Sequence, residues 1–216
     1  MNQATHDILR RSFELGLSMR LYIALLHYPV TNKNDERIAS AITTFDLHDL
    51  ARLSRTYGVK RFFVITPLTD QQRLAERIKS HWTGGYGAVY NPDRKLALEI
   101  ASVSGSLEET IREIEATERE RPLLIATDAS TQNVRSLDYE EAKQMIHSDR
   151  VLMILFGTAW GLDKALIQEA DYLLDPVVGP TTYNHLSVRT AAAIILDRLA
   201  GRNDTIRRKY EHHRNH

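Results

Sequence analysis

Short apolar runs and helix-like segments alternate along most of this chain, and this alternation restricts the possible folds more than any other feature. Each run has the length of a buried strand and is bounded by turn residues. Six runs occur, at 21–26, 61–66, 98–103, 122–126, 151–156 and 172–174. The pattern predicts an α/β domain with an open, mostly parallel sheet and helices on both faces.

The domain limits follow from where the alternation begins and ends. We expect a helical extension at 1–19, a single domain at 20–200, and a basic, disordered tail at 201–216. Helices are expected from Asp46 or Asp49 to Tyr57, and at 70–80, 106–117, 138–147, 162–170 and 185–200. The stretches 31–42 and 83–87 are expected to be loops, the second of them mobile.

Composition excludes several classes of protein. The chain has no cysteine, so it has no disulfide framework, and its nine histidines do not pair at metal-ligand spacing, so no metal is expected. No apolar run is long enough to cross a membrane and no signal peptide is visible, which predicts a cytoplasmic protein without a membrane partner. Lys+Arg and Asp+Glu balance at 28 each, yet basic residues gather around the first two core helices and indicate an RNA surface: Arg52, Arg55, Lys60, Arg61, Arg73 and Arg77.

A ligand site is expected at the carboxyl ends of the last three strands, because such sheets bind ligands there. These ends carry Thr127 and Asp128, then Gly157 and Gly161, then 175–180 with Gly179. Glycine permits close backbone approach or positive φ. Gly157→Val is therefore expected to fill ligand space and abolish binding while leaving the fold intact. No phosphate-binding glycine motif follows the first strand, which disfavours a nicotinamide dehydrogenase.

The last helix begins with polar residues and then becomes strongly apolar. Asn184 or Thr182 can cap it, and the backbone N–H groups of its first turn can face a ligand. Its apolar face is wide and includes Val188, Ala192 and Ile195. Such a helix must be covered on more than one side, which predicts a homodimer that arginine at Ala192 or Ile195 would disrupt.

Three C-terminal motifs together resemble the SPOUT superfamily of RNA methyltransferases, and more narrowly a bacterial family of predicted RNA methyltransferases. They are Leu155-Phe156-Gly157-Thr158-Ala159-Trp160-Gly161-Leu162, Leu174-Asp175-Pro176, and Tyr183-Asn184-His185-Leu186-Ser187-Val188-Arg189 with its alanine-rich helix. The stretches 45–52, 56–59 and 90–94 also match that family, and the resemblance spans about residues 20–200. Gly-Thr-Ala-Trp-Gly at 157–161 departs from the Gly-Pro-Glu-Gly-Gly-like loop of many superfamily members.

The resemblance implies a C-terminal trefoil knot that binds S-adenosylmethionine, and a homodimer with its active site at the interface. Apolar cover for the cofactor would come from Leu155, Phe156, Val177 and Leu186. The cofactor-binding residues would be Ala126, Thr127, Asp128, Leu155, Phe156, Gly157, Thr158, Gly161, Leu162, Asp175, Pro176, Val177, Gly179, Tyr183, Asn184, His185, Leu186 and Ser187.

The candidate catalytic residues lie in the part that resembles the substrate side: Asp46, His48, Asp49 and Arg52. They could accept a proton from the methyl acceptor or contact RNA phosphate. Alternatively, Asp46 and Asp49 only cap a helix and complement its dipole. The expected function is methyl transfer from S-adenosylmethionine to a ribose hydroxyl or base nitrogen of rRNA or tRNA. The alternative is a non-catalytic regulator that binds S-adenosylmethionine or a nucleotide, or an RNA-binding module.

Overall fold

The computed structural model describes residues 19–130 and 135–201. The expected extension at 1–19, apart from its last residue, and the expected tail from 202 onward lie outside the described residues. The described part is built on one seven-stranded sheet with the order β5-β4-β1-β8-β6-β9-β7, in which every pair of neighbours is parallel. Its strands are β1 (Leu21–Leu26), β4 (Arg61–Ile65), β5 (Ala101–Ser104), β6 (Leu123–Thr127), β7 (Ser136–Leu137), β8 (Leu152–Gly157) and β9 (Tyr172–Leu174).

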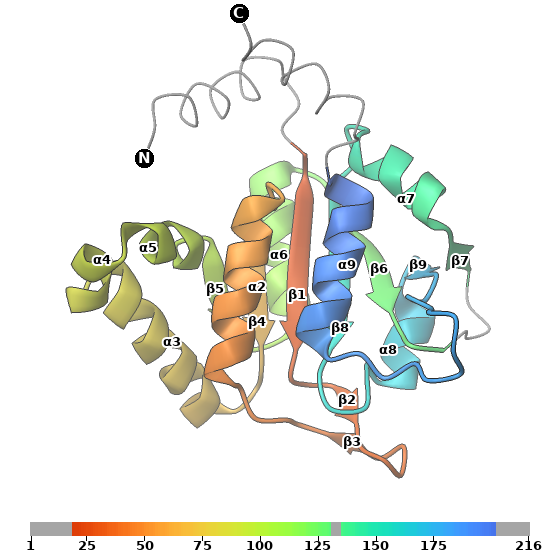
Figure 1. Ribbon diagram of the computed structural model, residues 1–216, viewed down its shortest axis with the longest axis horizontal. Helices are drawn as coiled ribbons and strands as arrows, with labels where there is room; N and C mark the ends of the chain where they lie inside the picture. The colour runs from red at the N-terminus through yellow and green to blue at the C-terminus, as the bar shows by residue number, and fades with distance from the viewer. Residues whose placement is uncertain (1–18, 131–134, 202–216) are drawn as a thin grey trace, which may run out of the picture.

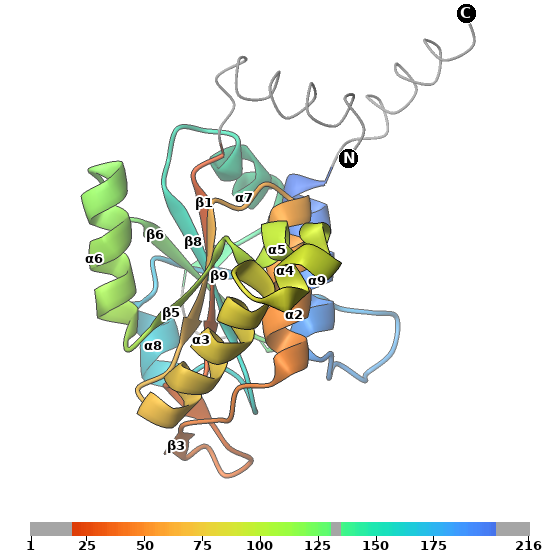
Figure 2. The ribbon, with the colours of Figure 1, turned by 90° about the vertical axis from the view of Figure 1, so that its left-hand side faces the viewer.

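Helices cover both faces of the sheet (Figure 1). Viewed along the sheet, α6 (Leu107–Glu118) and α8 (Lys164–Glu169) lie on one face (Figure 2). The other face carries α2 (Thr44–Thr56), α3 (Thr69–Thr83), α5 (Pro92–Leu98), α7 (Tyr139–Ile146) and α9 (Val188–Ala200), with the short α4 (Tyr86–Tyr90) beside α3. The predicted open, parallel α/β sheet with helices on both faces is confirmed.

The strands are apolar on both sides because each face is covered by helices. Along β1, Leu21, Ile23 and Leu25 pack into the core under α2 and α9. The alternate residues Tyr22, Ala24 and Leu26 pack into the core under α6 and α8. A central strand of this sheet therefore requires a continuous apolar run, without the alternation of apolar and polar residues that marks a half-exposed strand.

Three expected assignments of local structure differ from the structure. The strand expected at 98–103 begins only at Ala101, because Asn91 caps α5 and Pro92 occupies its first turn, so that the run to Leu98 is helical. The loop expected at 83–87 is mostly helical, since α3 continues to Thr83 and α4 begins at Tyr86. The loop expected at 31–42 contains part of a small hairpin formed by β2 (Val30–Thr31) and β3 (Arg37–Ile38).

Both expected helix caps near the pocket are also displaced. Thr43 caps α2 by accepting a hydrogen bond from the N–H of Asp46, so Asp46 lies inside the first turn. Ser187 caps α9, because the side-chain amide of Asn184 donates instead to the carbonyl of Ala129 at 2.7 Å.

The order of the last strands in the sheet differs from their order in the sequence. β9 lies between β6 and β7, although β6 and β7 are neighbours in sequence. The hydrogen bond from the side-chain amide of Asn184 to the carbonyl of Ala129 joins the segment after β9 to the residues just after β6.

Helix α9 is covered within its own chain. It packs between α2 and α7 over the sheet (Figure 1), and Ala192, Ile195 and Leu199 are at most 4% exposed. Arginine at Ala192 or Ile195 would disrupt this core, so those substitutions do not test a dimer as expected. Among the described residues no helix is long and apolar enough to cross a membrane.

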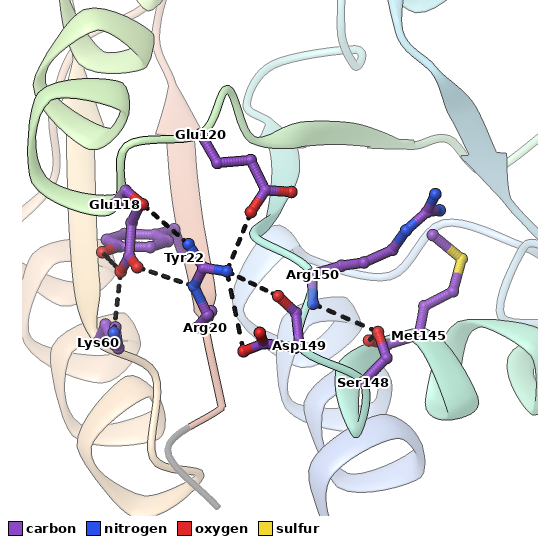
Figure 3. A network of polar contacts seen from close by, with 9 residues as sticks. All are labelled: Arg20, Tyr22, Lys60, Glu118, Glu120, Met145, Ser148, Asp149 and Arg150. Atoms are coloured by element: carbon purple, nitrogen blue, oxygen red, sulfur yellow. Dashed lines mark hydrogen bonds and ion pairs between the residues drawn. The ribbon is translucent and has the colours of Figure 1, made fainter.

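A polar network closes the amino-terminal edge of the sheet (Figure 3). Glu118, at the end of α6, accepts hydrogen bonds from Arg20, Lys60 and the hydroxyl of Tyr22. Arg20 also reaches Glu120 and the carbonyl of Asp149. Burial alone would raise the pKa of Glu118, but these hydrogen bonds outweigh it and lower the pKa to about 2. The network ties β1, β4, α6 and the 148–150 turn together at the edge opposite the strand ends discussed next.

Candidate functional site

A large pocket opens at the carboxyl ends of the strands, where the sequence predicts a ligand site. Its volume is about 1090 Å³. Four segments line it: the 40–46 stretch before and into α2, the end of β6, the loop after β8, and the chain from β9 into α9. Such a volume is ample for a nucleoside carrying a side chain.

The pocket brings together most of the predicted cofactor residues. Those that line it are Thr127, Asp128, Phe156, Gly157, Thr158, Gly161, Asp175, Pro176, Val177, Asn184, His185, Leu186 and Ser187. Ala126, Leu155 and Leu162 do not line it, because they are buried in the core under α6 and α8. Gly179 and Tyr183 are exposed and also lie outside the lining.

Sequence reasoning missed one wall and parts of the others. Ser40 and Ala41 line the pocket from the stretch 31–42 that was expected to be a polar loop, and Thr43, just after that stretch, lines it too. No motif marks them, and only the parallel pairing of β1 with β8 places that loop beside the last strands. Ala129, Ala159 and Trp160 also line the pocket and belong to segments that were expected to converge there, although they were not named as cofactor-binding residues. The remaining lining residues were not predicted: Ser130, Leu174, Thr182, Val188, Ala191 and Ile195.

The loop after β8 is tightly folded around two glycines. A Cβ atom on Gly157 would lie 2.5 Å from the backbone nitrogen of Leu162, and Gly161 has φ of +111°. The β2–β3 hairpin braces this loop: Thr31 N–H donates to the carbonyl of Gly161, and Trp160 N–H donates to the carbonyl of Thr31. A side chain at 157 would therefore displace the loop's own backbone, which corrects the expectation that it would fill ligand space.

A buried histidine stands behind the pocket wall. His27 is 0% exposed, and its Nδ1 lies 2.9 Å from the hydroxyl of Ser40, which lies 2.5 Å from the hydroxyl of Thr158. Thr158 donates its hydroxyl proton to the carbonyl of Leu26, so Ser40 donates to Thr158 and His27 Nδ1 carries the proton shared with Ser40. Burial lowers the pKa of His27 to about 4, so the ring is neutral at pH 7.

The charges that line the pocket are acidic. Asp46, Asp128 and Asp175 contribute carboxylates, and no lysine or arginine is among the described residues of the lining. Asp128 accepts hydrogen bonds from Ser130, and Asp175 accepts one from Ser136. The walls are otherwise largely apolar, with Phe156, Val177 and Leu186. This lining favours a neutral or cationic ligand over one that carries phosphate.

An arginine that was not predicted to act at the site links two of the candidate catalytic residues. Arg189, in the first turn of α9, places Nε 3.1 Å from Asp46 Oδ1 and a terminal guanidinium nitrogen 3.1 Å from Asp49 Oδ2. Asp46 lines the pocket, is 8% exposed, and also accepts a hydrogen bond from the hydroxyl of Thr43. Asp49 lies one turn further along α2 and does not line the pocket.

The other two candidate catalytic residues lie elsewhere. His48 packs edge-on against the ring of Trp82, with 5.6 Å between ring centroids, on the side of α2 that faces α3 and α5. Burial, followed by the nearby cation Arg94, lowers the pKa of His48. Arg52 is exposed, and the described part of the chain gives it no carboxylate partner. Neither side chain lines the pocket.

The predicted RNA surface is partly neutralised by ion pairs. Lys60 pairs with Glu118, Arg61 with Glu113, and Arg73 with Asp70. Arg52, Arg55 and Arg77 make no ion pair within the ranges that the structure describes. In those same ranges no cluster of three or more His, Asp or Glu side chains could hold a metal ion.

Comparison with known proteins assigns the chain to a family. Residues 20–201 match the family described as SAM-dependent RNA methyltransferase. The chain is 41% identical over 194 residues to a tRNA (guanine-N(1)-)-methyltransferase of Oleidesulfovibrio alaskensis, which covers 90% of this chain and 45% of that protein. It is 38% identical to an uncharacterized protein of Aquifex aeolicus, over 87% of this chain and 91% of that protein. The chain thus spans about half the length of the first relative and nearly all of the second.

The fold has solved counterparts. The structure of the A. aeolicus TrmH/SpoU tRNA modifying enzyme superposes with a TM-score of 0.52 at 14% identity, over 95% of this chain and 87% of that one. At this identity the similarity concerns the fold alone. The expected membership of a family of RNA methyltransferases is confirmed, and the chain belongs to the family of S-adenosylmethionine-dependent RNA methyltransferases.

Proposed function

We propose that this pocket binds S-adenosylmethionine and that the chain transfers its methyl group to RNA. The observation that carries the proposal is the lining: three carboxylates, apolar walls and no basic side chain among its described residues. A sulfonium cation attached to a nucleoside suits such a lining, whereas the pyrophosphate of a nicotinamide cofactor would be repelled.

The residues of this pocket fit the parts of such a cofactor. Phe156, Val177 and Leu186 offer apolar cover for the adenine ring. Asp128 and Asp175 offer acceptors for ribose hydroxyls, and the close-packed loop after Gly157 offers backbone groups. The cofactor supplies a methyl group already activated by the positive sulfur. The chain therefore has to hold the acceptor in line and remove its proton if the acceptor is a hydroxyl or a ring N–H.

Asp46 is the candidate proton acceptor, because it is the one predicted catalytic residue that lines the pocket. Its two oxygens already meet Thr43 and Arg189, so accepting a proton requires one of these contacts to loosen. Asp49 and Arg189 then act as positioning residues that hold Asp46 against α9.

We further propose that the substrate is tRNA or rRNA and that the acceptor is a ribose hydroxyl or a base nitrogen. The name of the O. alaskensis relative favours tRNA. That protein is about twice as long as this chain, so its guanine-N1 activity does not by itself assign the acceptor atom here. A cytoplasmic location would follow from such a substrate.

We also propose that the chain is a homodimer and that its C-terminal region forms a trefoil knot. The insertion of β9 between β6 and β7 supports the knot. Exposed apolar side chains at the pocket and next to it support a partner surface there: Trp160 and Leu186 of the lining are 67% and 44% exposed, and the neighbouring Tyr183 is 71% exposed. These exposures favour a dimer contact on the loop at Trp160 and the segment before α9 over one on Ala192 and Ile195.

Two measurements test the function. Calorimetry should show binding of S-adenosylmethionine and of S-adenosylhomocysteine, and none of NAD. Methyl-labelled cofactor should then label RNA from a bacterial strain that lacks the protein. Binding of the cofactor without labelling of any RNA would favour a non-catalytic regulator, and binding of NAD would contradict the assignment of the pocket.

A further inference from the structure

An exposed aromatic surface lies on α4, away from the residues that line the pocket. Tyr86, Val89 and Tyr90 are 76%, 81% and 73% exposed, and we refer to these three side chains as the aromatic face of α4. The two tyrosine rings stack on each other, with centroids 6.1 Å apart and planes inclined by 23°. Three adjacent large apolar side chains left in water on so short a helix indicate a binding surface.

The aromatic face is held on a rigid support. A Cβ atom on Gly87 would lie 2.6 Å from the Trp82 ring, so α4 sits directly on that indole. The guanidinium carbon of Arg94 lies 4.3 Å from the centroid of the Trp82 ring, and His48 meets the same residue edge-on. The helices α3 and α5 also pack against each other and against α4. A surface built this way is ordered before a partner arrives, which reduces the entropic cost of binding.

Two cations that have no carboxylate partner among the described residues lie on the helices that support α4. Within the described ranges, Arg77 and Arg94 form no ion pair, whereas Lys79 and Lys95 reach Glu76 and Glu99. Arg52 and Arg94 both lie close enough to His48 to contribute, after burial, to the lowering of its pKa. Arg94 of α5 thus lies over the ring that supports α4, and Arg77 lies on the neighbouring helix α3, although the whole chain has a net charge of zero.

We infer that the aromatic face of α4 stacks on unpaired bases of the RNA substrate, while Arg94 and Arg77 contact its phosphates. Exposed tyrosine rings beside arginines are the usual means of holding single-stranded nucleic acid, because every base offers a flat face for stacking. A second copy of this chain fits the surface less well, since a two-fold contact brings the same arginines of both copies together. The inference rests on the proposed RNA substrate and adds where that RNA is held and in which form.

The test compares two RNAs and two double variants of the full chain. Fluorescence anisotropy measures the affinity for a 12-nucleotide single-stranded RNA and for a blunt 12-base-pair RNA duplex. In the Tyr86→Ala/Tyr90→Ala variant we expect single-strand affinity to fall at least about tenfold, because stacking on an aromatic ring contributes roughly fivefold or more per base. Duplex affinity should change less than about twofold. The matched Tyr86→Phe/Tyr90→Phe variant keeps the rings and should bind both RNAs like the wild type.

The salt dependence of RNA binding separates the proposed stacking role of the tyrosines from the phosphate contacts of the arginines. Arg94→Gln should make RNA affinity less dependent on salt, and the tyrosine variants should keep the wild-type dependence. The inference is overturned if the alanine variant retains single-strand affinity, if the phenylalanine variant fails equally, or if the alanine variant changes only the sedimentation of the protein. These results leave the proposed function intact as long as the wild type binds S-adenosylmethionine and methylates RNA. A wild type that does neither removes the proposed function and this inference together.

Discussion

Arg189 Nε and Asp46 Oδ1 lie 3.1 Å apart across the contact between α9 and α2. The two residues are far apart in the sequence, but each lies in the first turn of its helix, and both helices begin at the pocket. Asp46 lines the pocket, while Arg189 follows directly after the lining residues Ser187 and Val188. This ion pair therefore ties the wall formed by residues 40–46 to the wall formed by the start of α9.

Arg189→Gln should destabilise the protein and weaken cofactor binding. The substitution leaves the carboxylate of Asp46, whose side chain is 12% exposed, without its counter-charge, at a cost of about 1–3 kcal/mol. Urea unfolding and calorimetry with S-adenosylmethionine measure the two effects. Arg52→Gln is the control for stability, because the described residues give Arg52 no carboxylate partner. Equal stability of the two variants would mean that the ion pair does not hold the pocket walls together.

Gly157→Ala should reduce cofactor affinity at least about tenfold. The new Cβ would lie 2.5 Å from Leu162 N and 2.7 Å from Gly161 C, so the loop that lines the pocket has to move. Gly179→Ala is the matched control, since no atom lies within 4 Å of a Cβ built there. Calorimetry on both variants decides the point, and a Gly157→Ala protein that binds as tightly as Gly179→Ala would contradict it.

The strand-and-helix pattern could be predicted from sequence because each strand is buried on both faces and therefore uniformly apolar. The errors fall where local capping overrides composition. The apolar run ending at Leu98 is typical of a strand, but Asn91 and Pro92 start a helix that includes it. Glycines at 84, 85 and 87 indicate a loop, but Gly87 is required because α4 approaches Trp82 too closely for a side chain.

The pocket could be predicted in part for a related reason. Its walls from β6, β8 and β9 carry glycine, proline and aspartate at strand ends, a pattern visible in the sequence. Ser40 and Thr43 reach the pocket only through packing between segments that are far apart in the sequence. The ion pair between Arg189 and Asp46 depends on the same kind of packing, and no local motif in a single sequence indicates it. His48 shares a helix with Asp46 but faces α3 and α5 instead of the pocket.

Glu118 should make the protein acid-sensitive below about pH 4.5. Its pKa is lowered from 4.5 to about 2 in the folded protein, so its stabilising contribution is complete above about 4.5 and is lost as the pH falls toward 2. The contribution is on the order of 3 kcal/mol. Urea unfolding at a series of pH values should show this loss in the wild type and not in Glu118→Gln. Glu120→Gln, which removes a more exposed partner of Arg20, should keep the wild-type profile.

His27 should produce a separate loss of stability as the pH falls, and this loss begins at a higher pH than the loss due to Glu118. Its pKa is about 4 in the folded protein and 6.5 as its ordinary value, so the unfolded chain binds a proton that the folded chain excludes. Stability therefore falls as the pH decreases from about 6.5 to 4, by on the order of 2–3 kcal/mol. His27→Asn carries no titrating group and can still donate to Ser40, so its stability should be nearly flat over this range. A variant with the wild-type slope would assign the loss to another group.

The hairpin formed by β2 and β3 should govern cofactor affinity through one ion pair. Arg37 donates two hydrogen bonds, of 2.9 and 2.8 Å, to the carboxylate of Asp163, which also caps α8 and lies directly after the pocket loop. The hydrogen bonds from Arg37 are the main cause of the lowered pKa of Asp163. The backbone bonds between Thr31 and the 160–161 turn depend on the hairpin staying in place. Loss of Arg37 should therefore loosen the loop that lines the pocket.

Arg37→Ala should lower the free energy of unfolding only slightly, since the Arg37 side chain is half exposed, and should weaken cofactor binding severalfold. A second ion pair between the β2–β3 hairpin and α8 provides a matched control. Lys164 of α8 pairs with Asp35 of the hairpin at 2.8 Å, and both side chains are more than half exposed. Such a pair contributes roughly 0.5 kcal/mol or less, so Lys164→Ala should leave cofactor affinity unchanged. Calorimetry on the two variants isolates the contact at Asp163. If both bind S-adenosylmethionine equally well, the hairpin does not position the loop, and the geometry of the 157–162 segment is set by its glycines alone.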